Sequence, residues 1–133
     1  MIKEQRKDIE NETDVELLVN SFYTKVRNDV LLDAVFAPVI KGNWAVHLKL
    51  MVDFWSTLLL YSRKYNADPL AKHLPLRLSK AHFDQWIHLF NETVDELFVG
   101  GIAENAKKRA LSIARIMKAV KRISDVEVDN QGS

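Results

Sequence analysis

Apolar side chains recur at steps of three and four residues along most of this chain, and this spacing restricts its possible folds more than any other feature. Such a period places the apolar side chains on one face of an α-helix, whereas a strand requires strict alternation. It predicts four long helices, over residues 13–28, 43–59, 79–99 and 102–123. A sheet-rich fold of 133 residues needs many turns, but this chain contains 4 glycines and 3 prolines. We therefore expect one all-α domain over residues 1–133, with flexible tails at 1–12 and 124–133.

Residues that favour helix ends occur at the boundaries of these segments. Thr13 and Glu16 match a capping box, in which each side chain accepts a hydrogen bond from the other residue's backbone N–H. Asn43 suits the N-cap of the second helix. The pair Gly100-Gly101 is expected to end the third helix, because glycine readily adopts the left-handed conformation found there.

Two stretches depart from the long-helix pattern because prolines interrupt them. Pro38 and Gly42 break an apolar run, so we expect short helical turns over residues 29–42 rather than one helix. Pro69 suits the first position of another helix, and Pro75 disfavours helix at the residue before it. That helix is only about one and a half turns long, and His73 lies in its last turn.

Composition and charge exclude several function classes. The chain contains 0 cysteines, so disulfide frameworks, thiolate metal sites and cysteine nucleophiles are ruled out. Its 19 Lys and Arg balance 18 Asp and Glu, a ratio that gives no general attraction to nucleic acid or anionic lipid. The sequence lacks a secretory h-region, a long apolar span and the common nucleotide-binding and hydrolase motifs. We expect a cytoplasmic protein that binds neither nucleic acid nor membrane.

Four side chains are candidates for chemistry, and each also has a structural explanation. His73 is surrounded by leucines on its short helix, but it is equally consistent with a half-exposed surface histidine. His47 lies on the apolar face of the second helix, where a backbone carbonyl can satisfy a core histidine. Tyr23 and Trp86 lie beside or within apolar stripes and are by default packing residues. His82 and His88 are six residues apart on opposite sides of a helix, so they cannot share one metal ion.

Four blocks of sequence resemble the truncated haemoglobins, and within them group III. The blocks follow in the family's order, within a resemblance that spans roughly residues 13–122: Ser21–Arg27, Trp44–His47 with Met51 and Phe54-Trp55, Pro69–Leu74, and His82–Phe90. The resemblance implies a two-over-two helical sandwich around one protohaem IX. The glycine pairs that other truncated groups carry at the ends of the first two helices are missing, in agreement with group III.

The resemblance also assigns roles to individual residues. It makes His73 the proximal ligand of the haem iron and places Tyr23, His47 and Trp86 on the distal, ligand-binding side. The remaining haem-pocket residues that it implies are apolar: Phe22, Phe36, Met51, Phe54, Trp55, Leu70, Leu74, Phe83 and Phe90. A neutral imidazole binds iron through Nε2 while its Nδ1–H donates to a nearby carbonyl. No carboxylate is evidently placed to bond His73, which favours ligand binding over vigorous peroxidase chemistry.

The resemblance predicts a haem globin that binds O₂, and also NO, CO and cyanide, at one iron. Detoxification of NO or peroxide is compatible with such a site, and a reductase would then be needed to recycle the iron. We expect a monomer, because the core and the pocket consume the apolar residues. The alternative is a cofactor-free interaction module that uses the basic last helix, whose cations are Lys107, Lys108, Arg109, Arg115, Lys118, Lys121 and Arg122. The structural explanation of this stripe is a solvated helix face.

Overall fold

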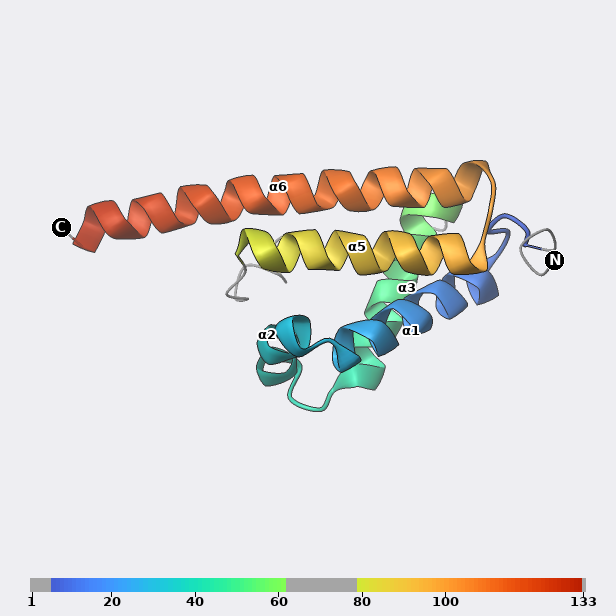
Figure 1. Ribbon diagram of the computed structural model, residues 1–133, viewed down its shortest axis with the longest axis horizontal. Helices are drawn as coiled ribbons and strands as arrows, with labels where there is room; N and C mark the ends of the chain where they lie inside the picture. The colour runs from blue at the N-terminus through green and yellow to red at the C-terminus, as the bar shows by residue number, and fades with distance from the viewer. Residues whose placement is uncertain (1–5, 62–78, 133) are drawn as a thin grey trace.

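The helices form two layers of two (Figure 1). The computed structural model describes residues 6–61 and 79–132, with side chains for 6–61 and 79–119. Helices α1 (Glu12–Asn28) and α3 (Trp44–Leu60) pack together as one pair, and α5 (Lys80–Leu97) and α6 (Gly101–Gly132) form the other. The short α2 (Val30–Ile40) packs against α1 and α5 at one end. The four long helices predicted from the apolar period are therefore confirmed, and the described residues contain no strand.

Aromatic rings fill the space between the two layers. Phe90 of α5 stacks on Trp55 of α3 with 4.8 Å between ring centroids. Phe22 of α1 contacts Phe90 in an edge-to-face arrangement, with 5.2 Å between centroids. Trp86, one turn before Phe90 on α5, stacks on the same ring at 5.9 Å. Phe22 and Phe90 are each 1% exposed, so this cluster joins α1, α3 and α5 at the centre of the core. Burial of rings of this size contributes strongly to the stability of small domains.

The N-terminal cap of α1 differs from the prediction. The helix begins at Glu12, and its N-cap is Asn11, whose Oδ1 accepts a hydrogen bond from the backbone N–H of Asp14 at 3.0 Å. The capping box assigned to Thr13 and Glu16 is therefore wrong. The cap lies two residues earlier because the preceding segment is itself fixed against the domain.

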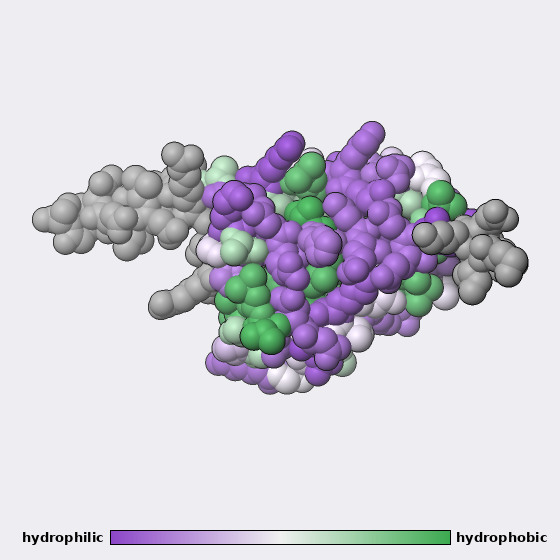
Figure 2. Space-filling view, in the orientation of Figure 1, coloured by the Kyte–Doolittle hydropathy of each residue, from purple (hydrophilic) through white to green (hydrophobic). Residues whose placement is uncertain are grey.

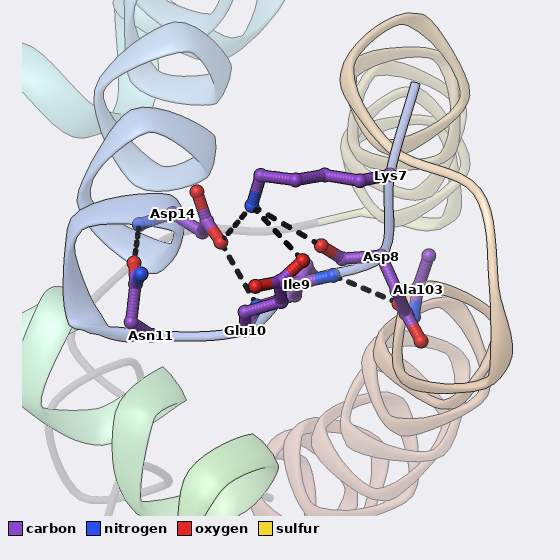
Figure 3. Close-up of polar contacts among 7 residues, drawn as sticks. All are labelled: Lys7, Asp8, Ile9, Glu10, Asn11, Asp14 and Ala103. Atoms are coloured by element: carbon purple, nitrogen blue, oxygen red, sulfur yellow. Dashed lines mark hydrogen bonds and ion pairs between the residues drawn. The ribbon is translucent and has the colours of Figure 1, made fainter. Parts of the chain in front are cut away.

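Residues 6–11 are part of the folded domain, which corrects the expectation of a flexible tail over 1–12 for this part of it (Figure 3). Ile9 is completely buried. The Asp8 carboxylate accepts hydrogen bonds from the backbone N–H groups of Ile102 and Ala103 at 2.9 and 2.8 Å, at the start of α6. Burial raises the pKa of Asp8, but these bonds and the one from the Ile9 N–H outweigh it and lower the pKa overall. A carboxylate at this position also interacts favourably with the helix dipole.

Helix α2 is continuous, so the prediction of short turns over 29–42 is wrong. Asp29 caps the helix by accepting from the Leu32 N–H at 2.9 Å, and Pro38 lies inside its last turn. Pro38 has no N–H to donate to the Ala34 carbonyl, so one helical hydrogen bond is missing there, yet the helix continues to Ile40. The helix stops at Lys41 and Gly42, which have φ values of 54° and 81°. Asn43 is the N-cap of α3 as predicted, although its side chain makes no capping hydrogen bond.

Helix α6 runs to Gly132, beyond the expected end at residue 123, and in Figure 1 it extends well past the start of α5. The predicted flexible tail over 124–133 is therefore helical over residues 124–132. The Gly100-Gly101 pair also acts differently from the prediction: α5 ends at Leu97, and Gly101 is the first residue of α6. The face visible in Figure 2 is largely hydrophilic, with apolar surface concentrated at the α2 end. No helix in the described residues is long and apolar enough to span a membrane.

Candidate functional site

Tyr23 and His47, both predicted to face a ligand, lie against each other. Tyr23 comes from α1 and His47 from α3, and their rings meet edge to face with 4.9 Å between centroids. Trp44, one turn before His47 on α3, contacts both rings, at 6.1 Å from Tyr23 and 5.9 Å from His47. Aromatic groups in this geometry attract each other through the positive ring edge and the negative ring face. Tyr23 and His47, which the sequence resemblance places on the same side of the pocket, are therefore in contact in the structure.

The Tyr23 hydroxyl is a buried donor in apolar surroundings. The residue is 2% exposed, and burial raises the pKa of its phenol above the usual value, so the hydroxyl keeps its proton at neutral pH. No hydrogen bond of its hydroxyl is found within the part of the chain that the structure describes, and this oxygen is not among the fully buried polar atoms that lack a partner there. The hydroxyl is therefore free to donate to a ligand or to water.

Trp86 lines a small apolar pocket between α2, α5 and α6. The cavity has a volume of about 20 Å³, and its lining is Leu32, Phe36, His82, Phe83, Trp86, Ala114 and Met117. Phe36 also contacts Tyr23, with 6.3 Å between ring centroids, so this pocket adjoins the Tyr23 cluster. The Trp86 indole N–H, which can only donate, has no acceptor among the described residues. Two donors from different helices thus border one apolar region.

The other predicted pocket residues fall into two groups. Phe22, Met51, Phe54, Trp55 and Phe90, from α1, α3 and α5, are buried in one core cluster. Phe83 on α5 is also buried, but in a second cluster with Ala114 and Met117 of α6. His73, Leu70 and Leu74 lie outside the described residues. The predicted iron ligand and its neighbours therefore stay sequence predictions.

The contacts that Arg27 and His82 make around the site were not predicted. Arg27 on α1 places its guanidinium 4.6 Å from the centre of the Trp44 ring. Each residue shares a helix face with a predicted distal residue, because Arg27 follows Tyr23 by four and Trp44 precedes His47 by three, but their contact joins two helices. His82 lines the apolar pocket and caps α5: its Nδ1 accepts from the Ser79 N–H at 2.9 Å. His82 is therefore more than a solvated surface residue, whereas His88 is exposed.

Comparison with known proteins gives a consistent result. Residues 7–122 match the family described as bacterial-like globin. The group 3 truncated hemoglobin of Campylobacter jejuni is 32% identical over 108 residues, which cover 78% of this chain and 85% of that protein. The crystal structure of the group III truncated hemoglobin from Campylobacter jejuni superposes with a TM-score of 0.80 at 28% identity, and covers 86% of this chain and 94% of the other.

The family match covers most of the chain, and the structural match extends across both helix layers. The structural match confirms the truncated-globin fold class that the four sequence blocks implied. Globins as a family bind haem and, through it, diatomic gases. This chain belongs to the bacterial-like globin family and is a truncated globin of the group III kind.

Proposed function

We propose that this protein holds one protohaem IX and binds O₂ reversibly at its iron, with NO, CO and cyanide as further ligands. The observation that carries the proposal is the contact between the rings of Tyr23 and His47, whose centroids are 4.9 Å apart, with Tyr23 only 2% exposed and no hydrogen bond of its hydroxyl among the described residues. When bound, the haem would supply an iron that takes a diatomic molecule. His73 would hold this iron, on the basis of the sequence resemblance alone.

The residues present fit a haem. A porphyrin is a large apolar plate, and it needs apolar walls with few polar groups, placed only where the ligand sits. Met51, Phe54 and Phe83 supply buried apolar surface on two different helices. The Tyr23 hydroxyl and the Trp86 indole N–H supply donors that the described part of the protein does not use. The set contains no carboxylate, which would repel electron density on a bound ligand.

The three proposed distal side chains have distinct roles. Tyr23 holds its proton on the phenol oxygen, because burial raises its pKa, and donates toward the outer atom of the ligand. Trp86 offers a second donor from α5, across the pocket from α1. Each such bond contributes about 1 kcal/mol, and more where the surroundings exclude water. His47, packed against Tyr23, is proposed to orient that phenol and to screen the pocket from solvent.

Ligand binding is favoured over turnover, although NO dioxygenase or peroxidase-like activity stays compatible with the same pocket and would require a reductase. The alternative of a cofactor-free module gains no support from α6. Two of its cations are paired within the domain: Lys107 with Asp95 at 2.7 Å, and Lys118 with Asp84 at 3.4 Å. The cytoplasmic location and the monomeric state are part of this proposal and rest on the sequence.

The first experiment is an optical spectrum of the purified protein, ferric, then dithionite-reduced, then under CO. We expect a Soret band that shifts at each step, because the iron changes its oxidation state and then gains a ligand. A colourless protein that also fails to take up added haemin would contradict the proposal.

Tyr23→Phe then tests the donor. Removing the hydroxyl leaves the ring contacts in place but deletes the hydrogen bond, so the O₂ dissociation rate should rise by roughly tenfold, the effect of about 1.4 kcal/mol. Tyr61→Phe is the matched control, since Tyr61 is 77% exposed and loses the same hydroxyl far from the core. Equal O₂ dissociation rates in Tyr23→Phe, Tyr61→Phe and the parent protein would remove Tyr23 from the distal site.

A further inference from the structure

We propose that Arg27 and Trp44 form a gate on the distal side: Trp44 positions Tyr23 and His47, and Arg27 holds Trp44 in place over them. The gate controls how fast a small neutral ligand reaches the pocket. This inference rests on the proposed function, because it assumes that Tyr23 and His47 face a haem ligand.

The first support is the position of Trp44. Its ring lies within 6.1 Å of Tyr23 and 5.9 Å of His47, measured between centroids, and those two rings are 4.9 Å apart. The three rings therefore contact one another pairwise. Displacing the indole removes one side of the cage around both Tyr23 and His47, so each ring gains orientations that the indole now blocks. Trp44 is only partly buried, whereas Tyr23 is 2% exposed, which makes Trp44 the outer member of the cluster.

The second support is the contact that covers Trp44. The Arg27 guanidinium carbon lies 4.6 Å from the centre of the Trp44 ring, within the range of a cation–π interaction. Arginine suits this role because its planar guanidinium stacks on an aromatic face, which the compact ammonium of lysine cannot do. Arg27 is exposed and lies one turn after Tyr23 on α1. Helix α1 thus carries both Tyr23 and the arginine that covers Trp44, the residue packed against Tyr23.

The third support is the way α3 begins. Trp44 is its first residue, and the chain enters it through Lys41 and Gly42, both with positive φ. The N-cap, Asn43, makes no side-chain capping hydrogen bond, so an interaction that commonly fixes the first turn of a helix is missing here. The Arg27–Trp44 contact connects this first turn to α1. Releasing it allows the first turn of α3, which carries Trp44 and His47, to move without unfolding the core.

The experiment compares haem-loaded Arg27→Gln, Arg27→Lys and Trp44→Phe with the parent protein. Arg115→Gln is the matched control, since it removes one exposed arginine from α6 without an aromatic contact among the described residues. The measurements are the CO association rate after flash photolysis, the C–O stretching bands of the bound CO, and the ultraviolet resonance Raman bands of tryptophan. The last measurement detects loss of the guanidinium from the indole face whether or not a ligand is bound.

We expect Arg27→Gln to raise the CO association rate roughly threefold to tenfold, in keeping with a contact that is partly exposed to solvent. It should also broaden the C–O bands, because Tyr23 and His47 take several orientations. In both the CO association rate and the width of the C–O bands, Arg27→Lys should lie between Arg27→Gln and the parent. Trp44→Phe should resemble Arg27→Gln, while its ring still fills most of the space of the indole. Arg115→Gln should match the parent in all three measurements.

Two results would separate failure of the gate from failure of the proposed function. If Tyr23→Phe changes the C–O bands but Arg27→Gln and Trp44→Phe leave rate and bands unchanged, the distal site stands and the gate is overturned. If Tyr23→Phe also leaves them unchanged, the distal assignment itself fails. A lower melting temperature with unaltered association rate and C–O bands would show that Arg27 and Trp44 serve stability alone, which also overturns the gate.

Discussion

The absence of a side chain at Gly100 allows the N-terminal segment to pack against the start of α6. A Cβ atom added to Gly100 would lie 2.5 Å from the Cγ of Asp8, and the φ of 141° is one that other residues rarely adopt. The space left by this glycine lets the Asp8 carboxylate reach the first free N–H groups of α6, at Ile102 and Ala103. Position 100 therefore requires glycine for two reasons, the close approach of Asp8 and the positive φ of the backbone.

Gly100→Ala should destabilise the protein by about 2 kcal/mol or more, since it combines backbone strain with loss of the Asp8 cap. Gly42→Ala is the control, because Gly42 also has a positive φ but no atom within 4 Å of an added Cβ. Urea unfolding of both variants measures the difference, and the excess cost at Gly100 isolates the clash with Asp8. Equal losses for the two variants would mean that the approach of Asp8 contributes nothing.

At the scale of the helices, apolar periodicity predicts where the long helices lie. It does not predict helix ends that depend on contacts between residues far apart in the sequence. The apolar stripes located four long helices, because burial against the rest of the domain follows a 3.6-residue period. The same reasoning misplaced the start of α1 and divided α2. Asn11 rather than Thr13 caps α1 because Ile9 is buried just before it, a long-range fact that no local motif contains. Pro38 lies inside α2, so a proline by itself did not mark the end of a helix there.

The candidate site shows the same limit. The resemblance named Tyr23 and His47, and the fold places them in contact. Arg27 was absent from the prediction because an exposed arginine on a helix is usually only solvated, and its meaning depends on Trp44 arriving from another helix. The capping role of His82 was missed for the opposite reason: it is local, but histidine is not a usual third residue of a capping box.

Two substitutions distinguish the observed cap of α1 from the predicted one. Asn11→Ala removes the acceptor for the Asp14 N–H and should lower the free energy of unfolding by about 1 kcal/mol. Thr13→Ala should change it by less than about 0.5 kcal/mol, since Thr13 is an exposed residue inside the first turn. Thermal or urea unfolding monitored by circular dichroism gives both values. A larger loss for Thr13→Ala than for Asn11→Ala would reinstate the capping box at Thr13.

The whole molecule gathers its proposed ligand-binding groups from three helices, with Tyr23 on α1, His47 on α3 and Trp86 on α5. None of these helices presents such a pocket alone, so the site exists only when the two layers are packed. A haem that binds the packed form and not the unfolded chain must then stabilise the fold. The gain grows with the logarithm of free haem over its dissociation constant, reaching about 4 kcal/mol at a thousandfold ratio.

Haemin should therefore raise the melting temperature of the apoprotein by roughly 10 °C or more, given that 1 kcal/mol shifts a domain of this size by a few degrees. His73→Ala should lose most of that rise, because the proposed bond to the iron is removed, while the apoprotein should melt close to the parent. His88→Ala is the matched control, since His88 is an exposed histidine on α5. Differential scanning calorimetry with and without haemin measures all three proteins. A full haemin-induced rise in His73→Ala would show that another side chain holds the iron, and the proximal assignment taken from the sequence would then have to be abandoned.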